Sequence, residues 1–240
     1  MTPHSRCPRF HVGIIPDGNG RWAALRGRPR AEGYEAGAEA VRRVVTGASV
    51  LCIDTLTLFA FSADNWHRPG DEVRTLLGVL EDFLAEQACT TMEPRPRVMA
   101  IGRRDRIPAS LRSAIEMAES ATAGADGLRL RLAIDYSSRE AMLRAACRLY
   151  TAMEVSRESF ARRIESASAE TEPAPDVDLL IRTGGELRLS DFLLWECAYA
   201  ELYFTPRLWP DFDAADLAAA LGEFHSRERR FGRVPQRAAS

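Results

Sequence analysis

The 240-residue chain contains no lysine, so all 32 of its basic side chains are arginines. A Walker-type phosphate loop needs a lysine to reach the outer phosphates, and Schiff-base chemistry needs a lysine amine. Both are therefore excluded. Any phosphate chemistry in this chain must rest on arginine, backbone N–H groups, helix ends and metal.

Cysteine is scarce and scattered. The five cysteines are Cys7, Cys52, Cys89, Cys147 and Cys197. Their number is odd and no two form a Cys-x-x-Cys pair, so we expect neither a zinc site nor a disulfide framework.

The sequence also lacks a large net charge and a long apolar run. A net charge of -2 gives no electrostatic footprint for nucleic acid. No apolar run approaches the roughly 18 residues of a membrane span, and the first residues do not follow the signal-peptide pattern. We expect a cytoplasmic protein with no nucleic-acid partner and at most peripheral contact with a membrane.

Apolar residues make up 46% of the chain, enough for a sizeable core. The patterns predict strands at 11–15, 54–61, 98–101, 128–134, 177–181 and 200–204. They predict helices at 31–48, 71–88, 108–121, 138–153, 156–164 and 213–227. This alternation predicts an α/β fold with a mostly parallel central sheet flanked by helices.

The chain reads as one domain over residues 11–232. A loose arm at 1–10 precedes it, a tail at 233–240 follows it, and Ser166–Pro175 has the composition of a surface linker.

Three polar segments follow predicted strands. They are Asp17–Arg21, Ser62–Arg68 and Arg182–Glu186. Ligands in parallel α/β sheets bind beyond the carboxyl ends of the strands. The sequence therefore predicts one active site assembled from three loops.

The first loop has the composition of an anion site. Gly18 and Gly20 allow the backbone to approach an anion closely, and Arg21 and Arg30 supply positive charge. A carboxylate beside such a loop suggests a bridging cation, so Asp17 is a candidate Mg²⁺ ligand shared with a phosphate. A glycine-rich turn with aspartate as a local cap is the alternative.

The same loop also matches a dinucleotide fingerprint, Gly-x-Gly-x-x-Ala, over residues 18–23. That motif requires a helix that starts at once and an acidic residue at the end of the second strand. The segment Arg26–Arg30 is expected to interrupt any such helix, and the second strand ends in Phe61-Ser62. These features argue against a nucleotide site.

The second loop offers groups that can orient a reactant. Ser62, Asn65 and Arg68 are polar, and Trp66 can wall an apolar pocket. A capped helix start with a solvated Arg68 is the alternative, because Asp71 and Glu72 are typical of a helical first turn.

In the third loop, Arg182, Arg188 and Ser190 could converge on one diphosphate, since arginine forks match phosphate oxygens. Glu201 is a second carboxylate that could meet the metal. A salt-bridged surface turn is the alternative.

From His11 to about Gly232, the chain resembles the undecaprenyl diphosphate synthase family, the cis-prenyltransferases. The resemblance rests on seven segments, 17–23, 60–69, 181–186, 192–195, 199–204, 209–212 and 227–232. It implies a Mg²⁺-dependent, typically homodimeric enzyme that joins isopentenyl diphosphate to an allylic diphosphate.

The resemblance also implies roles for individual residues. The allylic diphosphate would be bound by Gly18, Gly20, Arg21, Trp22, Arg30 and Tyr34. The isopentenyl diphosphate would be bound by Arg68, Arg182, Arg188 and Ser190. Asp17 and Glu201 would meet the metal, while Asp17, Asn19, Ser62 and Asn65 would act in catalysis. An apolar tunnel for the hydrocarbon would be lined by Trp66, Leu76, Val79, Leu80 and Phe83.

The resemblance puts Phe83 on the family's tunnel-lining helix, near a position where long-chain members tend to carry a small residue. It therefore predicts short products of about C10–C20, since one ring fills much of a narrow tunnel. The chain departs from the family at Pro16, Tyr34, Asp135–Arg139 and Leu187. These departures leave open an irregular head-to-middle coupling of two allylic diphosphates, with a lavandulyl-type product. A non-catalytic partner subunit of the same fold is the third alternative.

Overall fold

Six parallel strands form one sheet at the centre of the computed structural model, which describes residues 10–91, 93–149, 156–165 and 175–227. The strands are β1 (His11–Ile15), β2 (Thr55–Ser62), β3 (Arg97–Ile101), β4 (Arg129–Tyr136), β5 (Leu179–Arg182) and β6 (Glu201–Phe204). Their order across the sheet is β3-β4-β2-β1-β5-β6, and every neighbouring pair is parallel. The predicted α/β class is confirmed.

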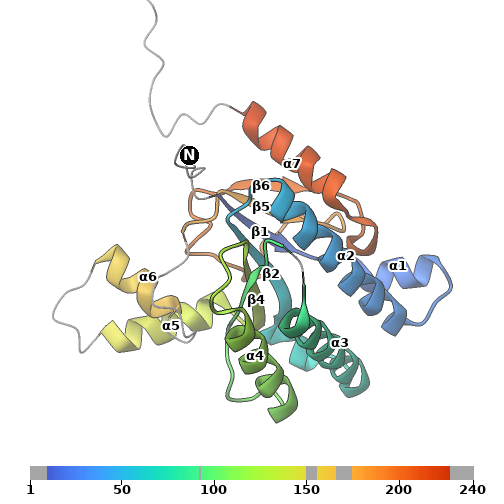
Figure 1. Ribbon diagram of the computed structural model, residues 1–240, viewed down its shortest axis with the longest axis horizontal. Coiled ribbons are helices and arrows are strands. Elements are labelled where there is room, and N and C mark those ends of the chain that lie inside the picture. Colours follow the sequence, from blue (N-terminus) through green and yellow to red (C-terminus); the bar gives the residue numbers. More distant parts are fainter. Residues whose placement is uncertain (1–9, 92, 150–155, 166–174, 228–240) are drawn as a thin grey trace, which may run out of the picture.

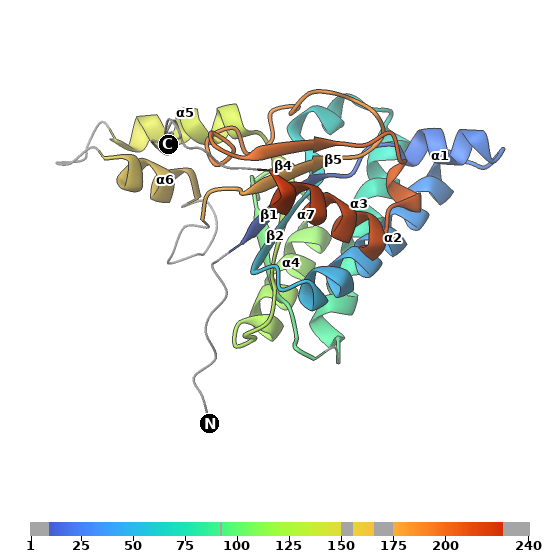
Figure 2. The ribbon, with the colours of Figure 1, turned by 90° about the horizontal axis from the view of Figure 1, so that it is seen from above.

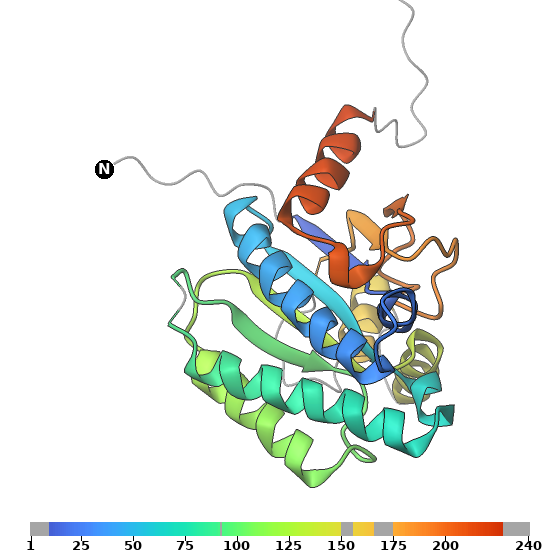
Figure 3. The same cartoon turned by 90° about the vertical axis from the view of Figure 1, so that its right-hand side faces the viewer.

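Helices cover one face of the sheet. The α-helices are α1 (Asn19–Leu25), α2 (Arg30–Val50), α3 (Gly70–Cys89), α4 (Ala109–Thr122), α5 (Ser138–Leu149), α6 (Arg157–Glu165) and α7 (Ala214–Ser226). Helices α2, α3 and α4 lie side by side, with α7 against α2 (Figures 1 and 3). Helices α5 and α6 form a pair apart from the others (Figure 2).

The core is divided by the sheet into two main layers. The larger layer joins apolar side chains of the strands to those of α2, α3, α4 and α7. On the other face, Phe192 and Leu193 of the β5–β6 connection pack against Ile15 and Leu180. That connection, which carries the third predicted loop, is therefore anchored in the core. The described residues form a single domain.

The first helix was not predicted. The expected break at Arg26–Arg30 is present, since α1 ends at Leu25 and α2 begins at Arg30. No helix was expected directly after Gly18, but α1 begins at Asn19. The prediction was wrong because seven residues are too few to show a helical period. One of the two arguments against a dinucleotide site is thereby lost. The other stands, because β2 ends at Ser62 and not at an acid.

Some predicted segments lie outside the described residues. They are residues 1–9 of the arm, 150–153 of one helix, 166–174 of the linker and the tail at 233–240. Within the described ranges, no helix combines the length and apolar character needed to cross a membrane.

Candidate active site

The carboxylate of Asp17 joins the first and third loops. Arg182 Nη2 donates to Asp17 Oδ2 at 2.8 Å, and Arg21 Nη2 donates to Oδ1 at 3.3 Å. The Asp17 N–H donates to Thr183 Oγ1 at 2.8 Å. Strands β1 and β5 are neighbours, with Ile15 level with Arg182, so both loops leave the same edge of the sheet. The structure thus brings the two arginine-rich loops together.

Two glycines permit this approach. Gly18 and Gly184 have φ values of 114° and 81°, in the left-handed region that favours glycine. A Cβ on Gly184 would lie 2.7 Å from Arg21 Nη2 and 2.9 Å from the Asp17 carbonyl oxygen. Any side chain at this position would push the two loops apart.

A polar pocket of about 330 Å³ opens beside Asp17. It is lined by Pro16, Asp17, Gly18, Asn19, Gly20, Arg21, Ala24, Arg30, Tyr34 and Arg68. Five of the six residues predicted for the allylic diphosphate therefore line one pocket. The exception is Trp22, whose Nε1 donates to Asp211 Oδ1 at 2.7 Å while Arg26 covers its ring.

Arg68 lies in this same pocket and not beside Arg182 as predicted. Its Nη1 donates to Glu72 Oε1 at 2.8 Å and to the Tyr34 hydroxyl at 3.2 Å. Because α3 begins at Gly70, two residues after Arg68, the start of α3 presents Arg68 and Glu72 to the start of α2.

Glu72 is a site residue that the sequence did not reveal, since it looked only like a helical first-turn acid. The Tyr34 hydroxyl donates to Glu72 Oε1 at 2.5 Å. Burial favours the neutral acid, but the hydrogen bonds from Tyr34 and Arg68, with the charges of Arg30 and Arg68, outweigh it and lower the pKa of Glu72. Burial, followed by the bond to Glu72, raises the pKa of Tyr34.

Arg182 and Ser190 meet as predicted. Arg182 is buried, and its Nη1 donates to Ser190 Oγ at 2.7 Å and to the Arg188 carbonyl oxygen at 2.6 Å. The Arg188 guanidinium itself pairs with Glu186 at the surface. Ser190 has a φ of 49° and Asp191 one of 63°, which concentrates backbone strain next to Arg182. Such strain is common at ligand-binding segments.

Glu201 does not join Asp17 within one chain. It is the first residue of β6 and lies level with Leu179, whereas Asp17 follows the carboxyl end of β1. Its carboxylate pairs with Arg227 after α7 at 3.3 Å. The parallel register therefore keeps these two predicted metal ligands apart within one chain.

Ser62 and Asn65 form a helix cap. The Ser62 N–H donates to Asn65 Oδ1 at 3.0 Å, and Ser62 Oγ accepts from the Asp64 N–H at 3.0 Å. Together they cap a 3-10 turn over Ala63–His67. These contacts match the alternative given above for the second loop, a capped helix start. The amide N–H groups of Asn65 are not used in this cap and can bind other partners.

Trp66 was predicted to line an apolar tunnel. It is not among the residues that line the apolar cavity between α2 and α3. Its Nε1 donates to Asp135 Oδ1 at 2.9 Å, and its ring packs edge-to-face on Phe61. Asp135 is buried and also accepts two bonds from Arg106. A buried carboxylate thus fixes the tryptophan away from the cavity.

An apolar cavity of about 80 Å³ lies next to the polar pocket, between α2 and α3. The other four predicted tunnel residues, Leu76, Val79, Leu80 and Phe83, line it. Pro16, Asn19 and Tyr34 line both spaces. Asn19 Oδ1 is buried there with no hydrogen-bond partner among the described residues. The polar, arginine-lined pocket therefore adjoins the apolar cavity.

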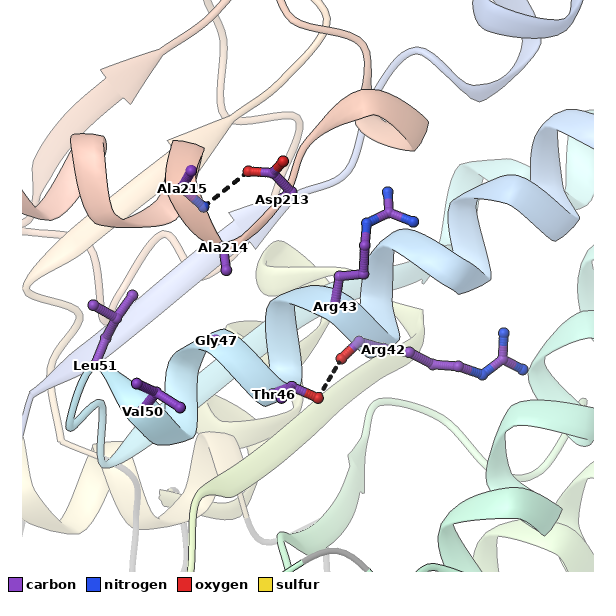
Figure 4. Close-up of a pocket in the computed structure, with 9 residues that line it drawn as sticks. All are labelled: Arg42, Arg43, Thr46, Gly47, Val50, Leu51, Asp213, Ala214 and Ala215. Carbon is purple, nitrogen blue, oxygen red and sulfur yellow. Dashed lines mark hydrogen bonds between the residues drawn. The ribbon is translucent and has the colours of Figure 1, made fainter.

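A larger groove of about 640 Å³ lies elsewhere, between the carboxyl half of α2 and the start of α7 (Figure 4). Ala214 packs closely over Gly47 beside it, and Val50 and Leu51 line its apolar end (Figure 4). It contains no predicted site residue, so size alone does not identify the site.

The residues present fit a Mg²⁺ ion only in combination with substrate. No group of three His, Cys, Asp or Glu side chains in the described ranges could hold a metal. Asp17, however, retains free lone pairs beside a pocket suited to phosphate oxygens. Mg²⁺ is commonly bound by one or two carboxylates together with substrate phosphates and water.

Comparisons with known proteins agree with this geometry. The family model described as putative undecaprenyl diphosphate synthase matches residues 15–232. Isoprenyl transferase 1 of Bradyrhizobium diazoefficiens is 52% identical over 95% of this chain and 91% of its own length. An isoprenyl transferase of Brucella abortus is 46% identical over 96% and 92%.

Two solved structures are also similar. Lavandulyl diphosphate synthase from Lavandula x intermedia, in complex with dimethylallyl diphosphate, has a TM-score of 0.86 at 36% identity, covering 92% of this chain and 97% of its own. A probable undecaprenyl diphosphate synthase from Campylobacter jejuni has a TM-score of 0.78 at 31% identity, covering 95% and 100%. The fold and the site define an enzyme that transfers prenyl groups. The chain belongs to the undecaprenyl diphosphate synthase family of cis-prenyltransferases, and the predicted family is confirmed.

Proposed function

We propose that this prenyltransferase condenses isopentenyl diphosphate with a short allylic diphosphate to give a short-chain cis-prenyl diphosphate. The contact between Asp17 and Arg182 carries the proposal, because it joins two anion-binding loops into one site. Two diphosphates held on neighbouring loops bring their hydrocarbon parts together, and orientation of this kind supplies much of the rate.

Each loop has a distinct role in this proposal. The allylic diphosphate binds at the polar pocket, where Arg21, Arg30 and Arg68 stabilise the charge that develops as the allylic C–O bond breaks. The isopentenyl diphosphate binds at Arg182 and Ser190. Its double bond supplies the electron pair of the new C–C bond, and a proton then leaves the isopentenyl carbon chain.

Asp17 would hold Mg²⁺ together with the allylic diphosphate, and the ion would supply further stabilisation of the leaving group. Asn19 and the amide of Asn65 would orient the reactants. The unpartnered Oδ1 of Asn19, at the junction of the two spaces, supports this role.

The size of the apolar cavity supports a short product. About 80 Å³ is well below the roughly 300–1,000 Å³ of typical ligand pockets. Phe83 is buried and contributes its ring to the lining. A product of about C10–C20 is consistent with one aromatic ring closing a narrow tunnel.

Irregular coupling of two allylic diphosphates is the second candidate. One observation favours it, the TM-score of 0.86 to a lavandulyl diphosphate synthase, against 0.78 for the undecaprenyl enzyme. Both couplings begin with the same ionisation, so the polar pocket alone does not separate them.

Product analysis tests the proposal. Purified protein with Mg²⁺ is given dimethylallyl, geranyl or farnesyl diphosphate, each with and without isopentenyl diphosphate, and a parallel set contains EDTA. We expect a linear cis product that requires both isopentenyl diphosphate and metal. A branched product from allylic diphosphate alone would establish irregular coupling, and a linear product far longer than C20 would contradict the chain-length proposal.

A further inference from the structure

Tyr34 occupies the junction between the polar pocket and the apolar cavity, and its side chain lines both. It lies in the first turns of α2 and is 5% exposed. A residue in this place can influence both how the diphosphate is held and where the hydrocarbon chain begins.

The hydroxyl of Tyr34 has no hydrogen-bonding capacity left for a diphosphate. A phenol has one donor and two acceptor lone pairs. The donor goes to Glu72 Oε1 at 2.5 Å, and the lone pairs accept from Arg30 Nε at 3.0 Å and Arg68 Nη1 at 3.2 Å. The predicted role of Tyr34 as a direct diphosphate ligand therefore conflicts with its contacts.

The two arginines tethered by this hydroxyl face the pocket. The side chain of Arg30 is 60% exposed and that of Arg68 is 37% exposed, while Glu72 between them is 14% exposed. Two positive charges against one negative charge leave the cluster net positive. The Arg30 guanidinium also lies over Gly20 of the first loop, since a Cβ there would be 3.0 Å from its Cζ.

We propose that Tyr34 is a positioning residue with two separable effects. Its hydroxyl, anchored on Glu72, holds Arg30 and Arg68 in place for the allylic diphosphate before that substrate binds. Its ring forms part of the wall where the hydrocarbon enters the apolar cavity. The inference rests on the proposed allylic site but concerns the arrangement of the arginines, which can be measured without turnover. Fixing charged groups in advance lowers the ordering cost of binding.

Tyr34→Phe tests the hydroxyl, because it keeps the ring and removes the tether. We expect calorimetric binding of inorganic diphosphate to weaken about 10-fold, the typical size of a lost hydrogen bond to a charged group. KM for the allylic diphosphate should rise more than kcat falls, while product length stays unchanged. Tyr203→Phe, in β6 and away from the pocket, is the matched control and should bind diphosphate like the wild type.

Tyr34→Ala tests the ring, since it removes both the tether and the wall. We expect it to alter product length in addition to weakening diphosphate binding. Unchanged diphosphate affinity in Tyr34→Phe would overturn the tether, and identical products from the two variants would overturn the wall. If diphosphate binding changes as expected but the wild type makes no prenyl product, the proposed function fails while the tether stands.

Discussion

His11 is a fully buried histidine at the start of β1. Its Nδ1 lies 2.8 Å from the Pro175 carbonyl oxygen, and its Nε2 lies 2.7 Å from Thr57 Oγ1. Burial, followed by the nearby charge of Arg131, lowers the pKa of His11 to about 3. The folded protein therefore holds this ring neutral, with its two nitrogens satisfied by a carbonyl and a hydroxyl.

This burial predicts a loss of stability in mild acid. The unfolded chain takes up a proton near pH 6.5 and the folded chain does not, so stability is full above pH 6.5 and falls as pH drops toward 3. By linkage, the free energy of unfolding should fall by about 2 kcal/mol between pH 7 and pH 5. Urea unfolding of wild type and His11→Gln at both pH values checks this.

The replacement should remove most of this pH dependence, even if it lowers stability at pH 7. His67→Gln, at an exposed position, is the control and should keep the wild-type slope. Equal slopes for His11→Gln and wild type would show that His11 is not the titrating group.

At this scale, sequence reasoning identified which residue types form the site but not how they pair. Asp17, Arg182 and Ser190 were predicted and do meet. The role of Glu72 and the position of Arg68 in the polar pocket were not predicted. A side-chain partner depends on how the first turns of two helices face each other in space. No short sequence pattern carries that information.

Helices α2 and α3 enclose the apolar cavity between them. Leu76, Val79, Leu80 and Phe83 follow the i, i+3, i+4, i+7 spacing of one helix face, and all four line the cavity. The family resemblance implied that these four residues line a tunnel, and their helical spacing puts them on one side of α3. The spacing could not show whether the side met solid core or an open space, because that depends on the residues opposite.

Residues of α2 supply the opposite wall, where Tyr34 and Val41 accompany two small residues. Gly37 and Ala38 line the cavity across from α3, and Phe83 is the aromatic side chain that α3 contributes to the lining. Phe83→Ala should therefore lengthen the product, measured by chromatography after dephosphorylation. It should also cost about 3–5 kcal/mol of stability, as expected for a buried phenylalanine.

Leu84→Ala separates the two effects. Leu84 is fully buried on the same helix but does not line the cavity, so its loss should cost a comparable stability without changing the product. If Phe83→Ala makes the wild-type product, or if Leu84→Ala lengthens it equally, the ring does not set chain length.

Across the whole molecule, the alternation of strands and helices predicted the parallel α/β class but not the strand order. Strand β6 follows β5 in sequence, yet the direction in which it adds to the sheet is set by packing. The parallel register of β6 on β5 explains why Glu201 does not meet Asp17 within one chain. A residue at the amino end of β6 is remote from a loop that follows the carboxyl end of β1, even though both belong to family motifs.

Strand β6 also ends the sheet, and an edge strand offers unpaired backbone groups to a second chain. Leu202 on β6 is 38% exposed, and Tyr199 just before it is 71% exposed. We propose that the homodimer implied by the family resemblance forms along this edge. The α2–α7 groove, where Val50 is 77% exposed, is a second apolar surface against which a partner can be tested.

Leu202→Asp and Val50→Asp discriminate between these surfaces. Each adds a charge to an exposed apolar position, and a charge buried without a partner strongly opposes association. Light scattering coupled to gel filtration should give a dimer for the wild type and for Val50→Asp, but a monomer for Leu202→Asp. A monomeric wild type would refute the dimer. Dissociation by Val50→Asp alone would move the interface to the groove, since the same charge would then be tolerated at the sheet edge.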